Sequence, residues 1–84
     1  MPYSVDYIKN KLSEKLDAQH VEVVDESDGC GGKFVVLVVS NAFIGKPLLQ
    51  RHRLVNSILE EELKEIHAFS QKTLTPEEWE KRNA

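Results

Sequence analysis

Residues 34–39 read FVVLVV, an uninterrupted apolar run. In an extended chain, alternate side chains point to opposite faces, so both faces of this segment are apolar. A strand of this kind suits the interior of a sheet, where neighbours cover it, rather than an edge. We therefore predict that residues 34–39 form the central strand, and the segments on either side decide how the sheet is built around it.

Upstream of this strand, the sequence predicts an edge strand and a helix. Val21 and Val23 alternate with Glu22, a period of two that is typical of a partly solvated strand, and the glycine-rich connection at residues 28–33 favours a hairpin. Earlier still, Ser4 can cap a helix that we expect to run to about Ala18. The apolar positions of that helix recur at spacings of three and four: Val5, Ile8, Leu12 and Leu16.

Downstream, residues 41–46 predict a short turn that ends near Gly45, and Pro47 suits the first position of a long helix. We expect the triple-glutamate run at residues 60–62 to be a solvated face, and His52 to be a hydrogen-bonded core or boundary residue. The predicted buried face of this helix consists of Leu48, Val55, Ile58, Leu59 and Leu63.

The C-terminal segment predicts a third strand and a last helix. The strand covers about residues 66–72. After it, Thr75, Pro76 and Glu78 combine an N-cap, a proline at the first helical position and an acid at the third, which is the pattern of a capping box. Trp79 is the expected anchor of this helix.

The order of these elements predicts an α+β fold, α-β-β-α-β-α, with a three-stranded mixed sheet in a single domain over residues 1–84. The central strand, the long helix and the third strand form a β-α-β crossover, which makes the two strands parallel if they are neighbours and gives the connection a right hand. Parallel neighbours begin at the same end of a sheet. The glycine-rich loop should therefore lie beside the first residues of the third strand.

Composition restricts the functional classes. The chain has 84 residues and a net charge of −3, which disfavours the binding of polyphosphate. Its only cysteine, Cys30, cannot form an internal disulfide, so we expect a reducing compartment and a free thiol. We see no signal peptide, transit pattern or membrane-spanning apolar run.

The predicted topology brings two metal-binding side chains to one sheet edge. Cys30 lies in the loop that enters the central strand, and His67 is the second residue of the third strand. Thiolate and imidazole are ligands for zinc, copper or the iron of an iron–sulfur cluster. Two donors make only half of a four-ligand site, so a partner would have to supply the rest. Without a partner, an incidental loop cysteine and a hydrogen-bonded surface histidine explain the same residues.

Two segments resemble a known family. F-x-G-K-P-L-L-Q-R-H-R-L-V-N at residues 43–56 and I-H-A-F-S-Q-K-T-L-T-P-E-E-W at residues 66–79 look like the BolA family, in its cytosolic and nuclear eukaryotic branch. The resemblance implies a fold similar to class II KH domains. It also implies an adaptor that pairs with a monothiol glutaredoxin, as a heterodimer or heterotrimer, and shares a glutathione-ligated [2Fe-2S] cluster. The family's ligands carry over as His67, within I-H-A-F, and as Cys30 in the loop between the first two strands.

From this resemblance we expect a non-enzymatic protein, monomeric when alone, that acts in cytosolic iron–sulfur cluster trafficking and iron regulation. The expected location is the cytoplasm, with the nucleus as a second site and no membrane association. We expect partner contacts at Arg51, Arg53 and Phe69 and assign no catalytic and no nucleic-acid-binding residues.

Two other functional classes remain. KH-like folds bind nucleic acid through a G-x-x-G loop, whereas the turn before the long helix here is F-I-G-K-P, and no basic stripe with interleaved aromatic residues occurs. A KH-like nucleic-acid-binding or transcriptional regulatory module is the alternative reading. A thiol reductase that uses Cys30 is weaker still, because the chain has no second cysteine to resolve the reaction.

Overall fold

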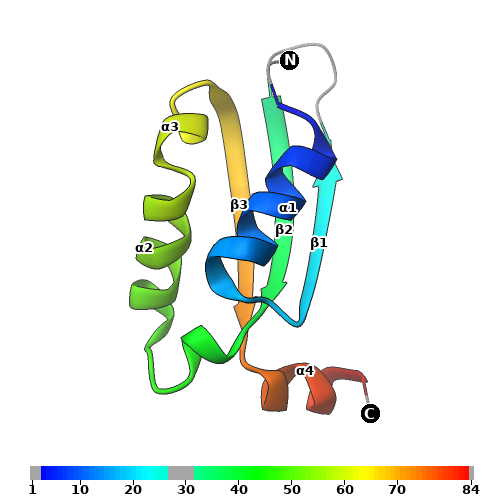
Figure 1. The fold of residues 1–84 in the computed structure, drawn as a ribbon, viewed down its shortest axis with the longest axis vertical. Helices are drawn as coiled ribbons and strands as arrows, with labels where there is room; N and C mark the ends of the chain where they lie inside the picture. The colour runs from blue at the N-terminus through cyan, green and yellow to red at the C-terminus, as the bar shows by residue number, and fades with distance from the viewer. Residues whose placement is uncertain (1–2, 27–31, 84) are drawn as a thin grey trace.

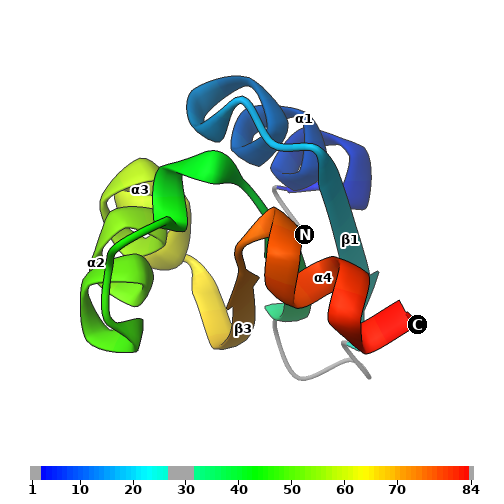
Figure 2. The same cartoon turned by 90° about the horizontal axis from the view of Figure 1, so that it is seen from below.

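The computed structural model describes residues 3–26 and 32–83, which form a mixed α+β fold with four α-helices. Helices α1 and α2 lie against the same face of a three-stranded sheet (Figure 1), and the view from below places α4 beneath the end of that sheet (Figure 2). No helix in the described ranges is long and apolar enough to cross a membrane. The elements in chain order are α1 (Val5–Leu16), β1 (His20–Asp25), β2 (Gly32–Val39), the 3-10 turn η1 (Asn41–Phe43), α2 (Leu48–Ile58), α3 (Glu60–Leu63), β3 (Ile66–Leu74) and α4 (Pro76–Asn83).

The sheet has the predicted topology. Its order is β1-β2-β3, with β2 central, antiparallel to β1 and parallel to β3. Strand β3 extends two residues beyond the predicted end, because Leu74 pairs with Val39 and its carbonyl accepts a hydrogen bond from the Ser40 backbone amide at 3.1 Å. The mixed three-stranded sheet is therefore confirmed.

The core lies between the sheet and the helices. Phe34, Val36 and Val38 occupy the helix-covered face of β2 and are at most 1% exposed. The opposite face is only partly covered, since Val35 and Leu37 are half-buried. Helix α4 covers the end of that face, where the ring of Trp79 stacks on His20 with ring centroids 4.6 Å apart.

Both predicted helix caps are confirmed. The Ser4 hydroxyl accepts a hydrogen bond from the Tyr7 backbone amide at 3.0 Å. At the start of α4, the Glu78 amide donates to the Thr75 hydroxyl at 3.2 Å, and the Thr75 amide donates to the Glu78 carboxylate at 2.8 Å, which is the reciprocal pattern of a capping box. Helix α1 ends at Leu16, two residues before the predicted end, because Asp17 adopts a left-handed conformation with φ 47°.

The long central helix is divided. Leu59, with φ −100° and ψ 20°, separates α2 from α3, and Pro47 is the N-cap of α2 rather than its first residue. Val55 and Leu59 are buried, as predicted. The prediction for Leu48 was wrong: its side chain is 58% exposed. Helical periodicity shows which residues share a stripe, but not how far the underlying layer extends beneath the first turn.

Candidate functional site

The predicted metal ligands belong to the end of the sheet where β2 and β3 begin. Gly32 pairs with Ile66, so the first residues of these two strands are neighbours, as the parallel pairing requires. Cys30 lies outside the described residues. Its pairing with His67 therefore stays a prediction.

The backbone is irregular at His67. Gly32 pairs with Ile66 and Lys33 pairs with Ala68, so β2 advances by one residue where β3 advances by two. His67 is the extra residue of this β-bulge. Bulges bend a strand locally, and they recur next to functional sites, where they change the direction in which a side chain leaves the strand. The irregular position coincides with the residue that sequence reasoning selected as a ligand.

A buried carboxylate lies just before this strand. Glu62, in α3, is 1% exposed, so the prediction that the glutamate run at residues 60–62 is a solvated face was wrong for this residue. Its Oε2 atom accepts hydrogen bonds from the Tyr7 hydroxyl at 2.6 Å and from Lys11 Nζ at 2.5 Å. Both donors belong to α1. The network therefore ties the first helix to the segment that leads into β3.

The charges in this network stabilise one another. Burial acts to raise the pKa of Glu62, but the hydrogen bonds from Lys11 and Tyr7 outweigh it and hold that pKa below its ordinary value. The same bonds raise the pKa of the Tyr7 hydroxyl and of the Lys11 ammonium. Tyr3 stacks on Tyr7 with ring centroids 5.2 Å apart, and a hydrogen bond to Glu65 raises its pKa. At neutral pH the network holds an ionised carboxylate between a lysine and a tyrosine.

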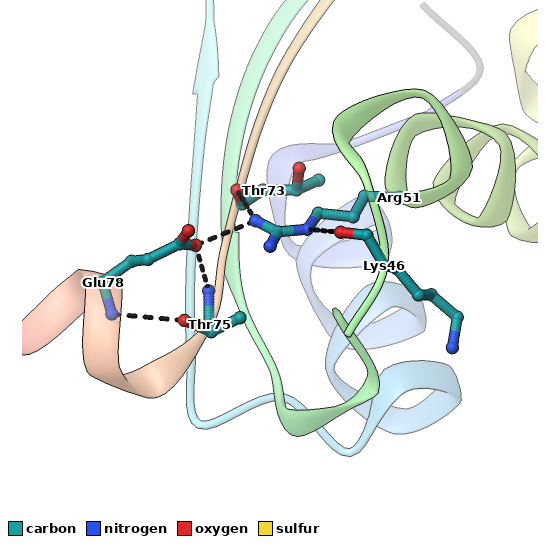
Figure 3. Close-up of polar contacts among 5 residues, drawn as sticks. All are labelled: Lys46, Arg51, Thr73, Thr75 and Glu78. Carbon is teal, nitrogen blue, oxygen red and sulfur yellow. Dashed lines mark hydrogen bonds and ion pairs between the residues drawn. The ribbon is translucent and has the colours of Figure 1, made fainter. Parts of the chain in front are cut away.

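Arg51 has contacts within the chain itself. Its side chain is only 13% exposed. It donates to the Lys46 carbonyl at 2.8 Å, to the Thr73 carbonyl at 3.3 Å and to the Glu78 carboxylate at 2.8 Å (Figure 3). These bonds join α2 to the end of β3 and to the cap of α4. The pKa of Glu78 is lowered, first by the Thr75 amide and then by Arg51.

The other predicted partner residues differ in exposure. Arg53 is exposed, whereas Phe69 is half-buried and packs against the core. A role for Arg51, Arg53 and Phe69 in binding a partner stays a prediction. His52 is a boundary residue, as predicted, but its Nε2 atom is buried and has no hydrogen-bond partner among the described residues.

Sequence reasoning missed Glu62, although a signal was present. Val55, Leu59 and Glu62 follow one another at spacings of four and three, so Glu62 falls on the buried stripe. The three consecutive glutamates favoured a solvated reading instead.

Within residues 3–26 and 32–83, no group of three or more His, Cys, Asp or Glu side chains is arranged to hold a metal ion.

Comparison with known proteins gives consistent matches. The family model described as BolA-like protein matches residues 12–78. BolA-like protein 2 of mouse (Mus musculus) is 61% identical over 80 residues, which cover 94% of this chain and 93% of the mouse protein. The DNA-binding transcriptional regulator BolA of Vibrio cholerae is 40% identical over 85 residues, which cover 93% of this chain and 80% of the Vibrio protein.

A solved structure agrees in fold. The crystal structure of a bol-like protein from Babesia bovis superposes with a TM-score of 0.93 at 44% identity and covers 100% of this chain and 98% of the other. The three-stranded mixed sheet and its helices are thus shared with a protein of this type over the whole chain.

Proposed function

The chain belongs to the BolA-like protein family, and on that premise we propose that it is a non-enzymatic adaptor that binds a monothiol glutaredoxin and shares a glutathione-ligated [2Fe-2S] cluster with it. His67 and Cys30 are the proposed ligands from this chain. The glutaredoxin cysteine and a glutathione thiolate would complete the coordination. The register of β2 and β3 is the observation that carries the proposal, because Gly32 lies beside Ile66 and the bulge marks His67.

The donor set fits such a cluster. Each cluster needs four protein or small-molecule donors, and this chain offers one thiolate and one imidazole. Cys30 is two residues from Gly32, and two residues of chain reach at most about 7 Å. Neighbouring strands lie about 5 Å apart. A cysteine at this position in the chain can therefore reach the start of β3, where His67 lies.

The mixed ligand set has chemical consequences. A [2Fe-2S] cluster supplies one-electron redox chemistry, and replacing thiolate by imidazole raises its reduction potential. A protonated imidazole cannot bind iron, so the shared cluster should be lost in acid more readily than one held by thiolates alone. We further propose that the protein is monomeric when alone and acts in the cytoplasm, and also in the nucleus, in cluster trafficking and iron regulation.

Visible circular dichroism of the reconstituted mixture tests this proposal. The chain and a monothiol glutaredoxin, with glutathione, iron and sulfide, should give a spectrum that differs from that of the glutaredoxin alone. His67→Ala should abolish the difference, and Cys30→Ala should weaken it or change its shape. His20→Ala is the matched control, because His20 pairs with Val39 at the opposite end of the sheet.

The outcomes separate the partner from the ligands. If the mixture gives only the spectrum of the glutaredoxin, the adaptor role is wrong. If a distinct spectrum forms but neither the His67 nor the Cys30 variant alters it, the partnership holds and our ligand assignment is wrong.

A second candidate function is the binding of DNA. The relative from Vibrio cholerae is described as a DNA-binding transcriptional regulator, and it is 40% identical to this chain. The net charge of −3 and the single glycine in F-I-G-K-P weigh against a KH-type backbone clamp. A salt-dependent mobility shift of a labelled oligonucleotide by the chain alone would favour this function.

A further inference from the structure

A hollow between α2 and β3 contains unusual polar groups. Its volume is about 300 Å³, and it is lined by Leu48, Arg51 and His52 from α2, by residues 71–74 of β3, and by Glu78. We call it the α2–β3 groove. Figure 3 shows three of its lining residues: Arg51 reaches from α2 to the Thr73 carbonyl and to Glu78.

Three residues that line this groove each carry a buried polar atom without a partner among the described residues. Four buried side-chain nitrogen or oxygen atoms have no hydrogen-bond partner in the part of the chain that the structure describes, and three of them are His52 Nε2, Gln71 Oε1 and Thr73 Oγ1. Thr73 is only 2% exposed. A buried polar group without a partner destabilises a fold, so three in one hollow indicate groups that a ligand satisfies.

The spacing of these atoms matches an extended peptide. Gln71 and Thr73 are alternate residues of β3, so their side chains leave the same face about 7 Å apart. Backbone amide groups that point to one side of an extended chain recur at the same interval. Gln71 Oε1 accepts hydrogen bonds, and the Thr73 hydroxyl both donates and accepts. Strand β3 is also at the edge of the sheet, which is where extended peptides dock.

The residues around the groove indicate which types of side chain such a peptide would carry. Ile44, Leu48 and Leu49 are 58–60% exposed and account for three of the five exposed large apolar side chains among the described residues. The carboxylates of Glu77 and Glu78 are already paired, with Lys81 and Arg51. In contrast, Lys72, which lines the groove, forms no ion pair with any described residue, and neither do Lys46, just before α2, and Arg53, within α2.

We propose that the α2–β3 groove binds an extended, apolar segment flanked by acidic residues, presented by a second partner protein. Thr73 is six positions after His67 in β3, which corresponds to about 20 Å of strand. The groove therefore lies toward the C-terminal end of β3, whereas His67 is at its start (strand β3 in Figure 1), so one molecule can engage both partners at once.

The test uses the isolated chain, without glutaredoxin or cluster, so its outcome is independent of the proposed function. An isotope-labelled sample is titrated with the peptide Glu-Glu-Leu-Val-Leu-Glu-Glu, blocked at both ends, up to millimolar concentration. We expect its amide resonances to shift at residues 48–53 and 70–74 and to stay in place at residues 5–16. The same peptide with lysine in place of each glutamate should bind more weakly.

Two variants distinguish binding from folding. Thr73→Val removes the unpartnered hydroxyl. The variant should bind the peptide about three- to tenfold more weakly, while the urea midpoint of its unfolding stays the same or rises. Leu48→Ser changes an exposed side chain and should also lower the affinity for the peptide. Ser70→Ala, on the opposite face of β3, is the control and should bind as the wild type does.

Three results would overturn the proposal. The first is that the acidic peptide shifts no resonance in the groove. The second is that both Thr73→Val and Leu48→Ser bind it as tightly as the wild type. The third is that a single-stranded oligonucleotide, but not the peptide, shifts these resonances, which would assign the groove to nucleic acid.

Discussion

Replacing Glu62 by glutamine removes one negative charge from a side chain that is 2% exposed, and it preserves the shape of that side chain. The carboxylate accepts a charged hydrogen bond from Lys11 at 2.5 Å and a second bond from the Tyr7 hydroxyl at 2.6 Å. A hydrogen bond to a charged group contributes about 1.5–3 kcal/mol to stability. The variant should lose part of this contribution from the Lys11 bond and can retain the bond from Tyr7.

Two effects reduce the loss. The Lys11 side chain is 26% exposed, so water screens the pair, and the variant no longer buries a carboxylate whose Oε1 atom has no partner among the described residues. We therefore expect the free energy of unfolding at neutral pH to fall by about 1–2 kcal/mol. In a domain of this size, that loss lowers the melting temperature by about 4–16 °C.

Urea denaturation over a range of pH measures both the loss and its cause. The pKa of Glu62 is lowered in the folded chain, so its ionised form stabilises the fold above the ordinary value of 4.5. That contribution disappears as the pH falls through the lowered pKa. The difference between the wild type and Glu62→Gln should therefore be largest at neutral pH and should narrow as the pH falls below about 4.5.

Glu61→Gln provides the matched control. Glu61 is the adjacent glutamate, its side chain is 76% exposed, and its ion pair with Lys64 at 3.4 Å lies on the surface. Surface pairs contribute little, so this variant should match the wild type. Equal stability of Glu62→Gln and the wild type at neutral pH, or a difference between them that does not change with pH, would refute the account of the Glu62 network.

Three further variants test other parts of the fold by urea denaturation. Thr75→Val removes the hydroxyl that accepts a hydrogen bond from the Glu78 amide and should lower the free energy of unfolding by about 1 kcal/mol. An unchanged urea midpoint would mean that the cap does not contribute to stability. Arg51→Met removes the donor to the Lys46 and Thr73 carbonyls and should cost about 2 kcal/mol, and a smaller loss than that of Thr75→Val would contradict the role of Arg51 in joining α2 to β3. Thr73→Val should instead stabilise the fold by about 1 kcal/mol, because it replaces a buried hydroxyl that has no partner among the described residues, and a clear loss would show that the hydroxyl is satisfied in solution.

Local patterns in the sequence determined much of the fold. The run at residues 34–39 is apolar on both faces and was correctly placed at the centre of the sheet. Thr75 and Glu78 formed the predicted capping box, and Ser4 the predicted cap. Each of these features depends on residues within a few positions of one another, so periodicity and capping chemistry are sufficient to predict it.

Only the tertiary structure decided the environment of individual side chains. Glu62 is buried because Tyr7 and Lys11 reach it from 55 and 51 positions away, and no local pattern records that approach. Leu48 is exposed although it shares the apolar stripe of its helix. The parallel register that brings Gly32 beside Ile66 followed from the order of the elements, but the bulge at His67 did not. A bulge depends on how two strands accommodate each other's twist and length, which is a property of the assembled sheet and not of either segment alone.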